Sequence, residues 1–123
     1  MKRSRTLTVS LMAGLLLAGF GAAAAHADAS QSYTLSGIER VNVSYKTSVN
    51  ELRVYDAYSD GYGGRSYWRT SNGSSGTADN SDGAYHSTVH SIPGVNGTIY
   101  FKACAKNGGV DVGCRTTDVS TTL

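Results

Sequence analysis

The feature that most limits the fold of this chain is the alternation of apolar and polar side chains over short runs. Val41, Val43 and Tyr45 occupy every second position, and the same spacing returns at Leu52 and Val54. Successive side chains of a strand point to opposite faces, so this spacing gives each run one apolar face. An amphipathic helix would need apolar residues three and four apart. The pattern therefore predicts an antiparallel β protein.

Clusters of Gly, Asn, Asp and Ser separate the alternating runs at the spacing typical of a sandwich or small barrel. We expect an all-β fold, a small antiparallel β-sandwich of about seven strands with an immunoglobulin-like topology. The predicted strands are approximately 32–35, 40–46, 51–57, 65–70, 84–90, 98–104 and 113–119. The intervening stretch 71–83, which has no apolar side chain larger than alanine, is predicted to be a loop.

The N-terminal stretch has the features of a secretory signal peptide. Three basic residues within the first five positions precede an uncharged apolar run over 7–25, and small residues follow at positions 25, 27 and 29. We expect a signal peptide over 1–27, with cleavage possible as late as residue 29. Residues 28–123 then form a single secreted, extracellular domain.

The predicted mature part is close to neutral, with eight basic and nine acidic side chains over 28–123. It therefore lacks the positive field that attracts nucleic-acid backbones and anionic lipids. No second apolar run is long enough to span a bilayer. We expect no nucleic acid, no membrane insertion and no cofactor, and we expect a monomer.

The two cysteines, Cys104 and Cys114, are predicted to form a structural disulfide, because an exported chain meets an oxidising environment and no third cysteine competes. If they face each other across a hairpin, residues whose numbers sum to 218 pair, and Phe101 lies opposite Thr117. A tight two-residue turn at Asn107-Gly108 would not give this register. The disulfide therefore predicts a bulged or longer hairpin and a bridge near the surface.

Two histidines remain after residue 27, at His86 and His90. On a strand their Cα atoms would lie about 13 Å apart, too far to share one Zn²⁺ ion. We expect both on the solvent face, with Val89 on the opposite face. The oxygen-rich stretch around Asp79 and Asp82 does not fit the EF-hand frame, and turn formation explains it better than calcium binding. We expect no metal site.

The chain carries neither a Gly-x-Ser-x-Gly elbow nor a phosphate-binding loop. We therefore expect no enzyme and assign no catalytic residue. A small hydrolase that uses His86 or His90 is the hypothesis that we rank third, after the binding module and the inhibitor described below.

Aromatic side chains gather between positions 55 and 68, interleaved with Asp and Arg. If Trp68 points into the core, Tyr67 and Arg69 point outward together, and Tyr58 and Tyr62 lie on the adjoining loop. Tyrosines beside flexible glycines make good contact surfaces, although they also fill cores that are poor in leucine.

The first hypothesis is therefore a secreted, non-enzymatic binding module whose ligand-binding residues are Tyr58, Tyr62, Tyr67 and Arg69. Its partner would be an extracellular polysaccharide or a protein. The alternative is an inhibitor of an extracellular hydrolase that inserts the loop over 58–64.

The leader that ends in AHADA and the closing segment IYFKACAKNGGVDVGC frame a domain rich in Tyr, Gly and Ser. In leader style, size and a terminal one-disulfide hairpin, the chain resembles the small exported proteins of filamentous actinobacteria. The resemblance implies export and a compact β fold, and it assigns no catalytic or binding residue.

Overall fold

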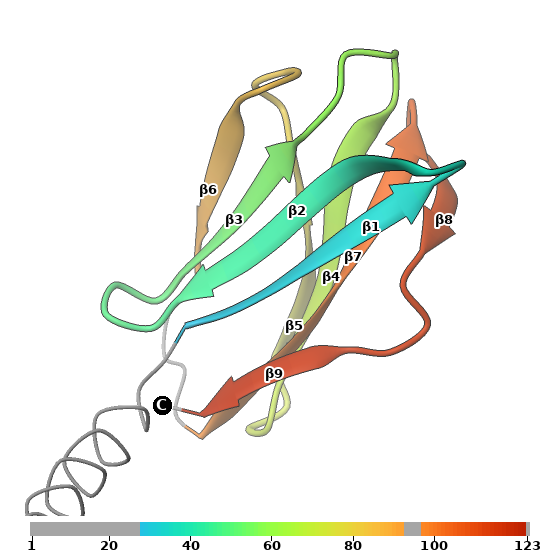
Figure 1. Cartoon of the computed structure of the whole chain (residues 1–123). Coiled ribbons are helices and arrows are strands. Elements are labelled where there is room, and N and C mark those ends of the chain that lie inside the picture. The colour runs from blue at the N-terminus through green and yellow to red at the C-terminus, as the bar shows by residue number, and fades with distance from the viewer. Residues whose placement is uncertain (1–27, 93–96, 123) are drawn as a thin grey trace, which may run out of the picture.

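The computed structural model describes residues 28–92 and 97–122, and these form nine strands in two antiparallel sheets (Figure 1). The first sheet has the order β1-β2-β3-β6, and the second has the order β5-β4-β7-β8, with β9 also paired to β7. The strands of the first sheet are β1 (Ala29–Leu35), β2 (Ile38–Lys46), β3 (Glu51–Asp56) and β6 (Ser87–Ser91). Those of the second are β4 (Gly63–Thr70), β5 (Ser75–Asp79), β7 (Thr98–Asn107), β8 (Val110–Cys114) and β9 (Val119–Thr122).

The strand order is that of an immunoglobulin-like sandwich, as predicted. Strand β3 lies between β2 and β6 in one sheet, while β4 lies beside β7 in the other. The chain therefore changes sheet between β3 and β4, between β5 and β6, and between β6 and β7. In the letters used for immunoglobulin folds, β2, β3 and β6 correspond to strands A, B and E, and β4, β7 and β8 correspond to strands C, F and G. Strand β1 is added beside β2, the equivalent of strand A.

The alternation seen in the sequence sets the core. Val41, Val43 and Tyr45 of β2 are fully buried, and so are Ile99 and Phe101 of β7, which face them from the second sheet. The predicted apolar faces of these strands are thus confirmed. They are buried because each sheet packs one face against the other sheet. Apolar side chains at period two on both inner faces therefore build one contiguous core.

Two strand predictions are wrong. The stretch 71–83 is not one loop, because residues 75–79 form the edge strand β5 opposite β4. Its sequence, SGTAD, has a single buried apolar side chain, Ala78, so pairing with β4 rather than an apolar pattern makes it a strand. The expected strand 113–119 is divided instead into the end of β8 and the start of β9, because residues 115–118 leave the sheet.

The disulfide is confirmed, with an S–S distance of 2.03 Å between Cys104 and Cys114, which lie directly opposite each other. The hairpin is bulged, as predicted: Ala105 faces Gly113 but Lys106 faces Asp111, so Val112 is the extra residue.

The register beyond the disulfide differs from the prediction, because Phe101 lies opposite Val119 rather than Thr117. The excursion over 115–118 shifts the pairing by two residues. It also leaves the Ala103 N–H without a strand partner, and the side chain of Gln31 from β1 accepts its hydrogen bond at 2.8 Å.

The predicted signal peptide, 1–27, lies outside the described residues. Asp28, the first described residue, already belongs to the fold, because its carboxylate accepts hydrogen bonds from the backbone N–H and the hydroxyl of Thr47. Across residues 28–92 and 97–122 the structure has no helix of the length and apolarity that a membrane span requires.

Candidate functional site

Three connections meet at one end of the sandwich, at the top of Figure 1: the β3–β4 loop (57–62), the β5–β6 loop (80–86) and the β7–β8 turn (108–109). We call this the three-loop end. An open hollow of about 460 Å³ lies between the loops. Loops at one end of an immunoglobulin-like sandwich sit on a rigid scaffold and are free to carry function. The side chains of the hollow are Asp56, Tyr58, Ser59, Asp60, Tyr62, Asn80, Ser81, Ala84 and Lys106, with Gly61, Gly63, Gly83 and Gly108 between them.

The β5–β6 loop is organised by Asn80, which is 7% exposed. Its Nδ2 donates to the carbonyls of Val54 and His86 at 2.9 and 2.6 Å, and its Oδ1 accepts from the backbone N–H groups of Asp82 and Gly83. All four hydrogen-bonding positions of the amide are thus used. The turn-forming interpretation of this acidic stretch is confirmed at Asn80, which ties the loop to strand β3.

The β3–β4 loop is held by Arg40 of β2, which is only 8% exposed. The Arg40 guanidinium pairs with the carboxylate of Asp60 and lies 5.5 and 5.2 Å from the ring centroids of Tyr58 and Tyr62. Cation–π contacts of this kind strengthen as the cation loses water. The two predicted loop tyrosines are therefore brought together and oriented by a buried cation.

Sequence reasoning missed Arg40. It lies two strands and about twenty residues before the loop that it holds, at the start of the alternating run of β2. Its environment depends on the loop folding back over β2, where the Ala57 N–H donates to the Arg40 carbonyl at 2.9 Å. No local pattern in the sequence carries that signal.

The floor of the hollow includes a buried carboxyl group, Asp56, which is 5% exposed. Its Oδ1 accepts the Tyr58 N–H at 3.3 Å. Burial raises the pKa of Asp56 above its ordinary value, because the charged form loses water, and the Tyr58 N–H opposes this only in part. A carboxyl group with a perturbed pKa that lines a hollow marks a candidate functional site.

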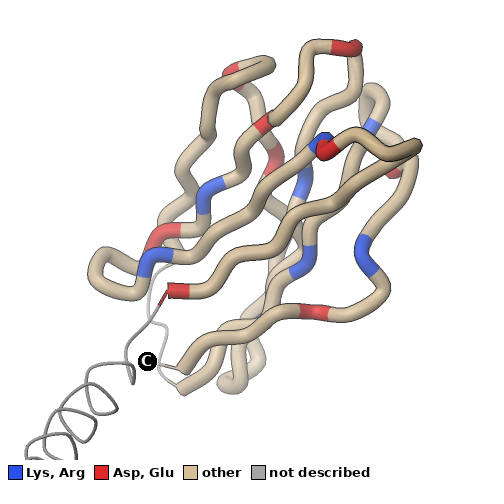
Figure 2. Tube along the Cα trace, in the orientation of Figure 1, with Lys and Arg blue, Asp and Glu red and all other residues tan. Residues whose placement is uncertain are grey.

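The other charged groups of the hollow are already paired. Asp60 pairs with Arg40, and the ammonium of Lys106 lies 3.4 Å from the Asp79 carboxylate. Hydroxyls, an amide and glycine backbone make up much of the remaining surface. The hollow is therefore polar but largely charge-compensated, and positive and negative residues are interspersed along the whole described trace (Figure 2).

The other two predicted site residues, Tyr67 and Arg69, lie elsewhere, on the outer face of the second sheet. They point outward together, as the alternation predicted, while Trp68 is half-buried against the core. Tyr67 donates to Asp111 of β8, and Arg69 lies 3.3 Å from Asp118. The structure thus divides the four residues into two pairs on different surfaces of the sandwich.

Arg65 of β4 lies along the chain between the loop tyrosines and the pair Tyr67 and Arg69. Its guanidinium contacts Asp79 at 2.7 Å and Asp111 at 3.0 Å, so it ties three strands together across the outer face. Arg65 lowers the pKa of Asp79, because it stabilises the charged carboxylate. The Arg65 and Tyr67 contacts of Asp111 hold the tip of the β7–β8 hairpin over the sheet.

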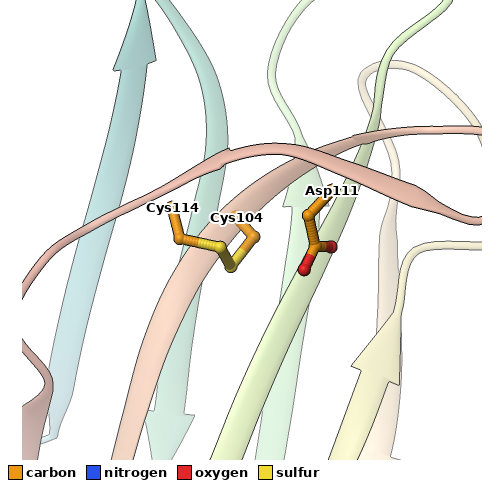
Figure 3. Close-up of side chains that lie close together, drawn as sticks. All are labelled: Cys104, Asp111 and Cys114. Atoms are coloured by element: carbon orange, nitrogen blue, oxygen red, sulfur yellow. A yellow bond between two sulfur atoms is a disulfide. The ribbon is translucent and has the colours of Figure 1, made fainter.

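Asp111 also lies close to the disulfide (Figure 3). Cys104, Asp111 and Cys114 are the only group of possible metal ligands found among the described residues, and the bridge occupies both sulfurs. The bridge lies on the outer face, but Cys104 itself is fully buried, between Arg65 on one side and Cys114 on the other. The prediction that the bridge lies near the surface is therefore wrong for Cys104.

The predicted exposure of His86 is confirmed, but the predicted placements of His90 and Val89 are wrong. Val89 faces solvent with 45% exposure, whereas His90 is half-buried and its Nε2 donates to the Asp79 carbonyl at 2.8 Å. Strand β6 begins only at Ser87, so His86 precedes it and is exposed. Thr88 and His90 turn inward because both make hydrogen bonds rather than apolar contacts: Thr88 bonds Ser81 and Asp82 of the β5–β6 loop, and His90 bonds Asp79 of the second sheet.

The fold and the three-loop end define a class, an immunoglobulin-like β-sandwich with a polar, aromatic hollow among the loops of one end. Comparison with known protein families, with curated proteins and with solved structures finds no match for this chain. The residues of the site are therefore the basis on which a function can be inferred.

Proposed function

We propose that this protein is an extracellular, non-enzymatic binding module that holds a neutral, polyhydroxylated ligand, a stretch of polysaccharide, at the three-loop end. The observation that carries the proposal is the buried carboxyl group of Asp56 in the floor of a hollow walled by Tyr58 and Tyr62. The disulfide supports an oxidising, extracellular setting.

The chemistry of the hollow favours a neutral ligand. An anionic ligand would need an uncompensated cation, but the Lys106 ammonium already pairs with Asp79. Among the described residues Asp56 is the carboxyl group of the hollow that forms no ion pair, and its burial suits hydrogen bonds from hydroxyls better than contact with a hydrated cation. Sugar hydroxyls donate and accept hydrogen bonds, which suits a buried carboxyl group, serine hydroxyls and exposed glycine backbone. The apolar faces of a sugar ring suit tyrosine rings, which present an apolar body and a polar tip.

The loops are also prepared for binding before a ligand arrives. Arg40 fixes Tyr58 and Tyr62, and Asn80 fixes the opposite loop. Prior ordering lowers the entropy that binding must overcome. A hollow of this size lies within the range of small-ligand sites.

The test is affinity electrophoresis against three neutral soluble polysaccharides, an α-glucan, a β-glucan and a mannan. We expect the wild-type protein to be retarded by at least one, and Tyr58→Ala and Asp56→Asn to weaken that retardation at least about tenfold. Tyr55→Ala is the matched control, because Tyr55 lies on the outer face of β3. No retardation by any of the three, or equal loss in the control variant, would contradict the proposal.

The second candidate is inhibition of an extracellular hydrolase by the β3–β4 loop. The observation in its favour is the Arg40–Asp60 pair, which holds this loop in one conformation as inhibitor loops require. It ranks second because the loop walls a hollow rather than standing clear of it. Stoichiometric loss of activity in a panel of extracellular proteases and glycosidases, abolished by Arg40→Met, would favour it over polysaccharide binding.

A further inference from the structure

A second hollow of about 370 Å³ lies on the outer face of the second sheet, toward the end of β4 that is far from the three-loop end. We call it the sheet-face groove. Its side chains come from β4, β5 and β7, together with Asp118 of the segment before β9. The groove shares no residue with the three-loop hollow.

Rings and cations alternate across the groove. Tyr67 of β4 lies opposite Lys102 of β7, and Arg69 lies opposite Tyr100. The Lys102 ammonium is 5.8 Å from the Tyr67 ring centroid, and the Arg69 guanidinium is 4.1 Å from that of Tyr100. Directly opposite residues of neighbouring strands share one face, so two rings and two positive groups are presented together.

The positive charge of the groove is only partly compensated. Arg69 pairs with Asp118 at 3.3 Å, but the Arg69 side chain is 58% exposed, so water screens this pair and an anion can compete with it. None of the ion pairs among residues 28–92 and 97–122 includes Lys102. The groove therefore offers a cation to an anionic group of a ligand.

The backbone of β4 and β7, in the middle of the groove, is not open for pairing with a peptide strand. Strands β4 and β7 both lie inside the sheet, and their edges are taken by β5, β8 and β9. Recognition over β4 and β7 must use side chains, and Ser75 and Thr77 of the edge strand β5 add hydroxyls beside the rings and cations. Rings, hydroxyls and an uncompensated cation on one face fit a ligand with a carboxylate, hydroxyls and an apolar ring face.

We propose that the sheet-face groove binds an acidic sugar, a pyranose that carries a carboxylate, as found in a polyuronate chain. Lys102 pairs with the carboxylate, and Tyr67 and Tyr100 pack against the sugar ring. This site is independent of the three-loop end, so either proposal can fail without the other.

The test is isothermal titration calorimetry of the protein with polygalacturonate at low ionic strength. We expect binding that weakens as salt is added, because the carboxylate pairs with a half-buried ammonium on the outer face of the sheet, where salt still screens charge. Lys102→Met keeps most of the apolar stem and removes the charge, and it should weaken binding about tenfold or more. Lys46→Met, which removes an exposed charge from the end of β2, is the matched control and should change affinity less than about twofold.

Four further measurements, with two variants and two polymers, distinguish this site from the three-loop end and an acidic sugar from other ligands. Tyr100→Ala should also weaken binding, whereas Tyr58→Ala at the three-loop end should leave it unchanged. In the Tyr58→Ala variant, where the three-loop end is weakened, dextran, a neutral polysaccharide, and polyglutamate, an acidic peptide, should both bind much more weakly than polygalacturonate. The proposal is overturned by absent binding of polygalacturonate, by equal binding of polyglutamate, or by an undiminished affinity in a folded Lys102→Met variant.

Discussion

Removal of the disulfide tests how the C-terminal hairpin is held. The bridge joins residues ten positions apart, and the chain-entropy relation for a closed loop of this length gives a stabilisation of about 2.7 kcal/mol. That is a sizeable fraction of the margin of about 5–15 kcal/mol typical of single domains. The double variant Cys104→Ala, Cys114→Ala should therefore remain folded but lose about 2.7 kcal/mol, and its melting temperature should fall by about 10–20 °C.

The assay is urea unfolding at pH 7, followed by circular dichroism, of the wild type in oxidised and reduced form and of the double variant. The reduced wild type should match the variant, and both should show a slightly larger dependence on urea because their unfolded chains are more expanded. A loss below about 1 kcal/mol would refute the entropic account. It would mean that the unfolded chain keeps residues 104 and 114 close together even without the bridge.

Three further outcomes follow from single contacts. Asp56→Asn should raise the free energy of unfolding at pH 7, because the native pKa of Asp56 is raised, and the gain should vanish as the pH falls to about 4, the unfolded pKa. Asp79→Asn should do the opposite: the native pKa is lowered by Arg65, so the wild type is more stable by at most about 1 kcal/mol at neutral pH and loses this advantage below about pH 4. Gly76→Ala should lower the free energy of unfolding by about 1–3 kcal/mol and shift the fluorescence emission of Trp68, because the added Cβ would lie 2.6 Å from the indole ring. Unchanged pH profiles of stability in the two Asp variants, or an unchanged emission maximum in Gly76→Ala, would contradict these expectations.

Much of the fold was predictable because its main signals are local. Alternation at Val41, Val43 and Tyr45 places their side chains in the core, whatever the remote partners are. The strand β5 was not predictable in this way, since its polar sequence gains order only by pairing with β4. The same reason explains His90, whose inward phase depends on a hydrogen bond to Asp79 in the other sheet.

The candidate site residues likewise include features that local sequence predicts and features that depend on remote contacts. The outward direction of Tyr67 and Arg69 follows from strand geometry, and the loop position of Tyr58 and Tyr62 follows from the glycines around them. That the four residues form two surfaces rather than one could not be seen, because Arg65 and its remote carboxylate partners occupy the space between them.

The sequence by itself determined the class of fold, the apolar faces of its main strands and the pairing of its two cysteines, because each of these depends on spacing within a short segment or on the lack of a competing partner. The tertiary structure decided where the functional surfaces lie. Arg40 reaches Tyr58 and Tyr62, and Lys102 joins Tyr67, only because the crossing of the chain between sheets brings distant strands and loops together. Contacts between residues far apart in the sequence carry no local pattern, so the buried cation of one site and the uncompensated cation of the other emerge only from the folded chain.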